Sequence, residues 1–86
     1  MNTQTNKPTQ TIRDGAIKAT IWPNMSDKGL FYTVEFSRTY TDEAGNVHSA
    51  GSFSGTQLLQ VARLAERAYD RIGELRVEAK SAKQAA

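Results

Sequence analysis

A change in hydrophobic periodicity at Ser54 constrains the fold more than any other feature of this sequence. Before Ser54, apolar and polar residues alternate in short runs, which predicts half-buried β-strands. After it, apolar residues recur every three or four positions, which predicts one long amphipathic helix. The segment 54–57 (SGTQ) matches a helix capping box, and Phe53 and Leu58 occupy the two positions of a hydrophobic staple. We therefore expect an α+β domain in which strands come first and a single helix closes the chain.

Three stretches before the helix alternate with period two. In residues 16–22, Ile17, Ala19 and Ile21 share one side, and residues 30–40 repeat the pattern from Leu30 to Phe36. The third stretch, 47–53, is weaker because small residues dilute it, but Val47 and Phe53 share parity and are expected to reach the same core.

The connections between these stretches favour antiparallel pairing. Residues 23–29 form a loop rich in turn residues, and residues 42–46 (DEAGN) have the form of a type I turn followed by a left-handed glycine. The strands should then make a three- to four-stranded β-meander, in which Ile12 and Arg13 would add a short strand before the turn at Asp14-Gly15.

The helix has a broad apolar surface, which suggests two contacts. One side would cover the sheet and the remainder would pack on a second copy, so a homodimer through helix residues 58–79 is expected. Gly73 leaves three alternatives open. The helix ends there, bends there, or continues because a neighbouring backbone needs the space.

The chain is organised as one small domain. With 86 residues and no cysteine, it can hold a single core and lacks disulfides as a source of stability, so self-association is a serious expectation. Residues 1–11 are predicted to be a disordered arm, residues 12–80 the folded domain, and residues 81–86 a frayed tail. Because no apolar run suits a membrane span or a signal peptide, the cytoplasm is the expected location.

The formal net charge of +2 gives little support for a phosphate-binding domain. Basic and acidic residues are equal in number between positions 13 and 72, and the surplus comes from the two ends of the chain. Arg63, Arg67 and Arg71 form a stripe on the helix, but Glu66 and Asp70 lie among them, so a solvated, self-compensated face is the favoured interpretation.

Little in the sequence points to catalysis. His48 is the single histidine, and no metal-ligand spacing, phosphate-binding loop or nucleophile elbow occurs. His48 and Glu35 would resemble an acid–base pair on adjacent strands, but an exposed histidine beside a turn is the ordinary case. We therefore expect no enzymatic activity, cofactor, metal or small-molecule substrate.

The sheet face opposite the helix is more informative, because its aromatic residues serve no local core. Trp22 and Phe31 would stack on bases while Lys18 and Arg13 contact phosphates, the usual combination for single-strand binding. Hydroxyls should add hydrogen bonds, and the full set expected on this face is Lys18, Thr20, Trp22, Phe31, Thr33, Ser37, Thr39, His48 and Ser52. Alternatively, the two rings fill a dimer interface or a second small core under the N-terminal arm.

Arg38 and Tyr40 have core parity but are expected at the edge of the domain, past the helix. They would add an arginine and a stacking ring to the nucleic-acid site. In the alternative interpretation, Arg38 pairs with Asp42 or Glu43 and Tyr40 caps the core.

The stretch 36–66, FSRTYTDEAGNVHSAGSFSGTQLLQVARLAE, resembles the C-terminal domain of the transcriptional positive-coactivator (positive cofactor four) family and its small bacterial relatives, which are related in architecture to Whirly proteins. The shared features are an aromatic strand end at Tyr40, an acidic-glycine hairpin at 42–45, a polar cap at Ser54 and leucines near the helix start. This resemblance implies a dimer whose helices pack together and whose curved sheets bind single-stranded DNA without strong sequence preference. The opening IRDGAIKATIWPN also looks like small bacterial proteins of mobile elements.

Taken together, the sequence predicts a homodimeric single-stranded nucleic-acid-binding protein, with DNA the expected ligand. Two alternatives stay open. One is a protein-binding adaptor or inhibitor module of a mobile element, and the other is a purely structural homo-oligomer.

Overall fold

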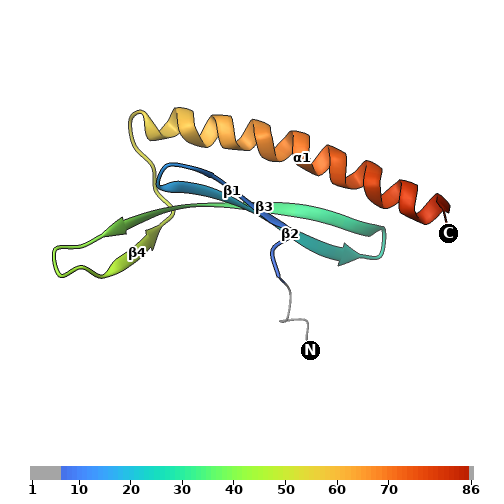
Figure 1. Ribbon diagram of the computed structural model, residues 1–86, viewed down its shortest axis with the longest axis horizontal. Coiled ribbons are helices and arrows are strands. Elements are labelled where there is room, and N and C mark those ends of the chain that lie inside the picture. The colour runs from blue at the N-terminus through green and yellow to red at the C-terminus, as the bar shows by residue number, and fades with distance from the viewer. Residues whose placement is uncertain (1–6, 86) are drawn as a thin grey trace.

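A computed structural model describes residues 7–85. One antiparallel sheet with strand order β1-β2-β3-β4 is covered on one face by a C-terminal helix (Figure 1). The predicted α+β meander closed by a helix is confirmed, and it has four strands. The elements are β1 (Gln10–Asp14), β2 (Ile17–Ser26), β3 (Gly29–Thr41), β4 (Val47–Ala50) and α1 (Gln57–Ala85).

The first strand begins earlier than the sequence pattern suggests. Gln10 and Thr11 were expected in a disordered arm, but they pair with Ile21 and Thr20 of β2. The backbone N–H of Thr9 also donates to the Ile21 carbonyl at 2.8 Å. Residues 1–6, the rest of the expected arm, lie outside the described residues.

Strand β2 continues through Pro23, where the sequence suggested a loop over 23–29. Pro23 lies opposite Tyr32 in the β2–β3 ladder, and the connection shrinks to a tight turn after Ser26. Alternate residues of an antiparallel strand direct their backbone groups to the same side. The Ile21 carbonyl points toward β1. A backbone N–H at position 23 would point to the same side, but past Gln10, the first residue of β1, where no described strand pairs with that side of β2. Proline is tolerated there because no ladder bond is lost.

The β3–β4 connection has the predicted turn. The Gly45 N–H donates to the Asp42 carbonyl at 3.0 Å, and Gly45 takes a φ of 88°, which glycine adopts without steric cost. The Asp42 carboxylate accepts hydrogen bonds from the N–H groups of Ala44 and Asn46, each at 2.9 Å. This local network sets the register of β4 against β3.

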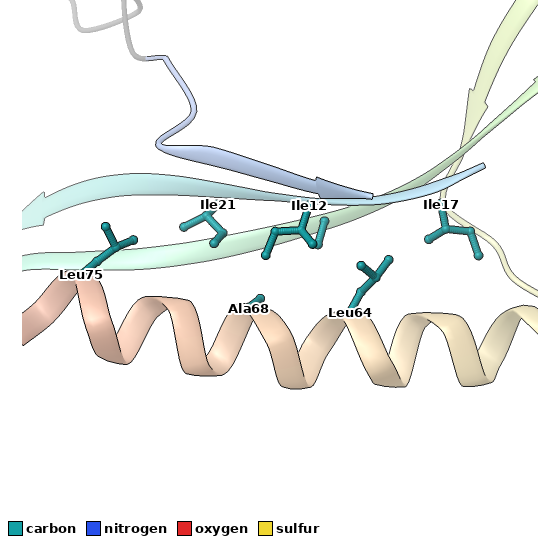
Figure 2. Close-up of a cluster of buried hydrophobic side chains, with 7 residues drawn as sticks. Ile12, Ile17, Ile21, Leu64, Ala68 and Leu75 are labelled. Atoms are coloured by element: carbon teal, nitrogen blue, oxygen red, sulfur yellow. The ribbon is translucent and has the colours of Figure 1, made fainter. Parts of the chain in front are cut away.

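The core lies between the sheet and one side of α1 (Figure 2). The predicted inward set of Ile17, Ala19 and Ile21 is confirmed, since all three are buried against Leu64 and its neighbours. Burying one such isoleucine or leucine stabilises the fold by about 1.5–3 kcal/mol. In the part of the chain whose burial is described, the cluster of buried apolar residues is Ile12, Ile17, Ala19, Ile21, Leu64, Ala68 and Leu75.

Val47 does not join this core, contrary to the prediction. It lies opposite Thr41 in the β3–β4 ladder and is 72% exposed, whereas Phe53 does pack against the core cluster. Strand β4 ends at Ala50, so Phe53 belongs to the connection between β4 and the helix. The alternation of a strand therefore does not apply to Phe53, and its shared parity with Val47 does not place the two side chains on one face.

The helix begins at Gln57, two residues later than a cap at Ser54 predicts, because Gly55 has a φ of 52° and cannot belong to a right-handed helix. One hydrogen bond of the predicted cap is nevertheless present. The Ser54 N–H donates to the Gln57 side-chain oxygen at 3.0 Å, which is one half of a capping box. α1 then runs through Gly73 without interruption to Ala85, into the segment expected to fray after residue 80. A Cβ built on Gly73 would meet nothing within 4 Å, so no backbone within residues 7–85 requires a glycine there.

Within residues 7–85, α1 is not apolar enough along its length to serve as a membrane-spanning helix.

Candidate functional site

Six of the eight predicted site residues gather on the sheet face that α1 leaves uncovered. Residues directly opposite each other in an antiparallel pair point to the same face. Arg13 lies opposite Lys18 between β1 and β2, and Trp22 lies opposite Thr33 between β2 and β3. These positions alternate with the buried Ile12, Ile17 and Ile21 and therefore point away from the helix. The six residues on this open face are Arg13, Lys18, Thr20, Trp22, Phe31 and Thr33.

One end of the open face is aromatic. Trp22 is half-buried and Phe31 is 45% exposed. The two residues are diagonal neighbours across β2 and β3, a relation that places side chains about 7–8 Å apart, within reach of large rings. Asn24 shares this face and donates from Nδ2 to Thr33 Oγ1 at 3.0 Å and to the Trp22 carbonyl at 3.3 Å. The two rings thus form a surface that the fold itself does not cover.

The other end of the open face is cationic. Arg13 is exposed and Lys18 is half-buried beside it, with the one acidic side chain of this region, Glu35, on the neighbouring strand opposite Thr20. Lys18 and Trp22 are four residues apart on one strand, which corresponds to about 13 Å. The cationic end and the aromatic end of the open face therefore follow one another along the direction of β2.

A shallow groove of about 450 Å³ crosses this face between the two ends. Thr20 lies in its floor and is only 7% exposed, so its hydroxyl is less accessible than the sequence pattern suggested. The groove is lined by Pro8, Thr11, Lys18, Thr20, Trp22, Glu35, Phe36, Ser37, Ser49, Ala50 and Gly51. Thr11 and Asn24 are polar residues of this face that sequence reasoning missed, because they lie in segments expected to be a disordered arm and a loop.

Arg38 and Tyr40, the remaining two predicted site residues, lie on the other side of the sheet. They project from the β3–β4 hairpin, which extends past the start of α1 (Figure 1). The Arg38 guanidinium lies 5.5 Å from the centre of the Tyr40 ring, and its Nε donates to the Ser52 carbonyl at 3.0 Å. Arg38 therefore contacts neither Asp42 nor Glu43, and Tyr40 is 45% exposed and does not cap the core.

His48 belongs to this second cluster and not to the open face where it was expected. It lies opposite Tyr40, and the two rings stack with centroids 5.2 Å apart. Its Nε2 is 2.7 Å from Asp42 Oδ2, and this hydrogen bond, followed by those from the turn backbone, lowers the pKa of Asp42. Because His48 and Glu35 point to opposite faces, the acid–base pair considered from the sequence does not form.

The arginine stripe on α1 is only partly self-compensated. Arg71 is 2.9 Å from Glu74 Oε1 and 3.2 Å from Glu78 Oε2, and these partners raise its pKa. Its Nε also donates to the Gln10 side chain at 2.7 Å, which ties the helix to β1. Arg71 therefore has a structural role, and its acidic partners are Glu74 and Glu78.

Among the described residues, no three His, Cys, Asp or Glu side chains come together in a way that could hold a metal ion.

Comparisons of the chain with protein-family models, with curated proteins and with solved structures found no match.

Proposed function

We propose that this protein binds single-stranded nucleic acid, DNA in the first instance, on the open face of its sheet and with low sequence specificity. The observation that carries this proposal is the position of Trp22 and Phe31, which are diagonal neighbours on a sheet surface that the helix does not cover. Every base has a π face, so aromatic side chains on a sheet can stack on a strand of any sequence.

The cations at the other end of the face suit the same ligand. Arg13 and Lys18 would neutralise phosphates about 13 Å from the rings, along the direction of β2. Thr33 and Asn24 would add hydrogen bonds near the rings. A single strand, whose bases are free to splay, can satisfy both ends at once. The resemblance of residues 36–66 to positive-coactivator domains points to the same ligand and to a homodimer.

Arg38 and Tyr40 have a separate part in this proposal. Their cluster with His48 faces away from the groove, so it would contact only a strand that wraps around the β3–β4 hairpin. The open face should therefore bind a short oligomer without them, and they should contribute only to longer ones.

Fluorescence anisotropy of a labelled oligothymidylate tests the proposal. Replacing Trp22 with alanine should weaken binding by about 1–3 kcal/mol, or about 5- to 150-fold in Kd. Tyr69→Ala is the matched control, because Tyr69 is a 79% exposed aromatic residue on the opposite layer and should be neutral. Duplex DNA and RNA oligomers of the same length measure the preference for strand form and sugar.

Two results would count against nucleic-acid binding on this face. The first is wild-type protein with no measurable affinity for any of the oligomers. The second is equal loss of affinity in the Trp22→Ala and Tyr69→Ala variants, which would indicate a nonspecific effect.

A protein-binding module is the second candidate, and the outer surface of α1 favours it. That surface exposes large apolar side chains that no described element covers, namely Leu58, Leu59, Tyr69 and Val77. An adaptor or inhibitor of this kind would bind no oligonucleotide and would lose its protein partner when Leu59 and Tyr69 are replaced with serine.

A further inference from the structure

Strand β3 has a long free edge on the side away from β2. It pairs with β2 along residues 29–38, but β4 pairs only with residues 38–41. The sheet order ends at β4, so the described chain provides no strand beside residues 29–37 of β3. A strand edge of this kind presents a row of unpaired N–H and C=O groups to any strand that approaches it.

The residues that direct these backbone groups outward follow from the observed hydrogen bonds. The Thr39 N–H donates to the Ala16 carbonyl, toward β2, and the Asp42 N–H donates to the Asn46 carbonyl, toward β4. Because the side alternates along the strand, odd-numbered residues of β3 bond to β2 and even-numbered ones face the free edge. The outward-facing residues are therefore Leu30, Tyr32, Val34 and Phe36.

The same four residues leave apolar surface beside the edge. Their side chains lie on the helix side of the sheet, but α1 lies mainly over β1 and β2, and its contact with β3 is smaller. Leu30 is 45% exposed, and Tyr32, Val34 and Phe36 are only half-buried against the core cluster. A strand added at this edge would satisfy the backbone and cover this apolar row in one step.

The two sides of the β2–β3 hairpin differ in how they are protected. The free edge of β2 beyond β1 carries Pro23, and proline is a common device that prevents strand addition. Residues 29–37 of β3 (GLFYTVEFS) contain no proline or lysine and only one charge, Glu35. Proteins usually blunt long apolar edges, so an unprotected one is best explained by an occupant.

We propose that two copies of this chain pair antiparallel through the β3 edge, with the two-fold axis at Thr33. This register sets Leu30 opposite Phe36 and Tyr32 opposite Val34 of the second copy, so all four outward-facing residues bond and the apolar row meets its own copy. Glu35 lies opposite Phe31 of the second copy and avoids facing itself, and Thr33 lies opposite Thr33, a favourable cross-strand pair. A segment that complements itself in hydrogen bonds, apolar pattern and charge fits a second copy better than an unrelated strand.

The size of the core makes the second copy the expected occupant. Among the residues whose burial is described, only seven apolar ones are buried, two of them alanine, and domains of this length are marginal without further support. The outer surface of α1, where the sequence predicted the dimer, fits less well because Glu66, Arg76 and Lys80 are exposed among its apolar residues. Edge pairing concerns the self-association in the proposed function, and it stands or falls independently of nucleic-acid binding.

Disulfide trapping tests the register directly, because the chain has no cysteine of its own. Non-hydrogen-bonded partners in an antiparallel pair have Cα atoms about 4.5 Å apart, which a disulfide can bridge. Thr33→Cys should therefore cross-link most of the chains under mild oxidation. Glu35→Cys is the matched control, since this register separates the two Glu35 residues by four positions, about 14 Å, and should give little cross-linked dimer.

A second variant removes the edge without removing β3 from the sheet. The Val34 N–H faces the free edge, so Val34→Pro leaves the β2–β3 ladder bonded and blocks the pairing of copies. In sedimentation velocity the wild type should be a dimer, and this variant should need at least tenfold more protein to dimerise. If far-UV circular dichroism shows that the variant is unfolded, the cysteine pair decides the question.

Four results would overturn edge pairing: a monomeric wild type at all concentrations, no cross-linking of Thr33→Cys, equal cross-linking of Glu35→Cys, or unchanged dimerisation of a folded Val34→Pro. Efficient cross-linking of Tyr69→Cys in place of Thr33→Cys would assign the contact to α1. Oligonucleotide affinity is measured on the wild type, because Thr33 itself belongs to the proposed nucleic-acid site. A wild type without affinity, together with efficient cross-linking of Thr33→Cys, would reject the proposed function and leave the edge pairing in place.

Discussion

Lys18 provides the sharpest test of where phosphates bind, through the salt dependence of the affinity. Each phosphate contact on a single strand contributes about −0.7 to the slope of log K against log salt. The open face of the strands carries two cations, Arg13 and Lys18, so the wild type should show a slope of about −1.4 from this face. Lys18→Gln should reduce it to about −0.7.

The expected change is large enough to measure. Between about 50 and 200 mM salt, two contacts predict an affinity loss of about sevenfold, and one contact predicts about 2.6-fold. Anisotropy titrations of the same short oligothymidylate at four salt concentrations give the slope. Arg38→Gln is the matched control, because Arg38 is a cation on the other side of the sheet, held over Tyr40, and should leave the slope of a short oligomer unchanged. An unchanged slope for Lys18→Gln, or an equal reduction for Arg38→Gln, would refute phosphate binding on the open face.

Three further predictions concern the fold. Leu64→Ala should lower the free energy of unfolding by about 2–5 kcal/mol in urea titrations, because Leu64 is fully buried. Leu59→Ala, on the outer side of the same helix, should lower it by less than about 1 kcal/mol, as an ordinary surface substitution does. Gly73→Ala should stabilise the protein by about 0.5–1 kcal/mol, since a Cβ there meets nothing; a loss of stability at dimer-forming concentrations would instead place a second copy against Gly73. The hydrogen bond to His48 lowers the pKa of Asp42. The stability that this bond contributes is therefore present above the unfolded-state pKa of the carboxyl and is lost as the pH falls through the lowered folded-state pKa. Asp42→Asn should make the melting temperature depend less on pH in the acid range, and an unaltered pH profile would contradict this.

Local patterns predicted those parts of the fold that local forces determine. Strict alternation around Ile17 and Ile21 identified the buried side of β2, because a one-residue shift would have exposed every apolar side chain. The cap at Ser54 and Gln57 likewise involves residues close together in sequence, and the structure has the expected hydrogen bond.

Predictions that depended on neighbouring strands were less successful. A strand can continue through Pro23 only if no neighbouring strand needs a backbone N–H at this position. That depends on where β1 begins, because its first residue, Gln10, pairs with Ile21. The placement of His48 was wrong because the parity of β4 was taken from Val47 and Phe53 and not from the turn. The Gly45-to-Asp42 hydrogen bond of the predicted turn sets His48 opposite Tyr40, so the correct register could have been counted from the sequence.

The candidate site and the proposed dimer contact both exist because α1 covers only part of the sheet. A single helix can cover only part of a four-stranded sheet, and here it lies mainly over β1 and β2 on one face. Within residues 7–85, the opposite face of the sheet, with Trp22 and Phe31, is thus uncovered, and the edge of β3 away from β2 is unpaired along residues 29–37. Pairing of two copies through β3 would place both open faces on the same side of one continuous sheet, with Phe31 of each copy next to the shared edge. A strand of nucleic acid could then cross from one set of rings to the other. If both proposals are right, the affinity of the wild type should increase with oligomer length until the strand spans both copies. The Val34→Pro variant, which cannot pair, should lack the increase that comes from contact with the second copy.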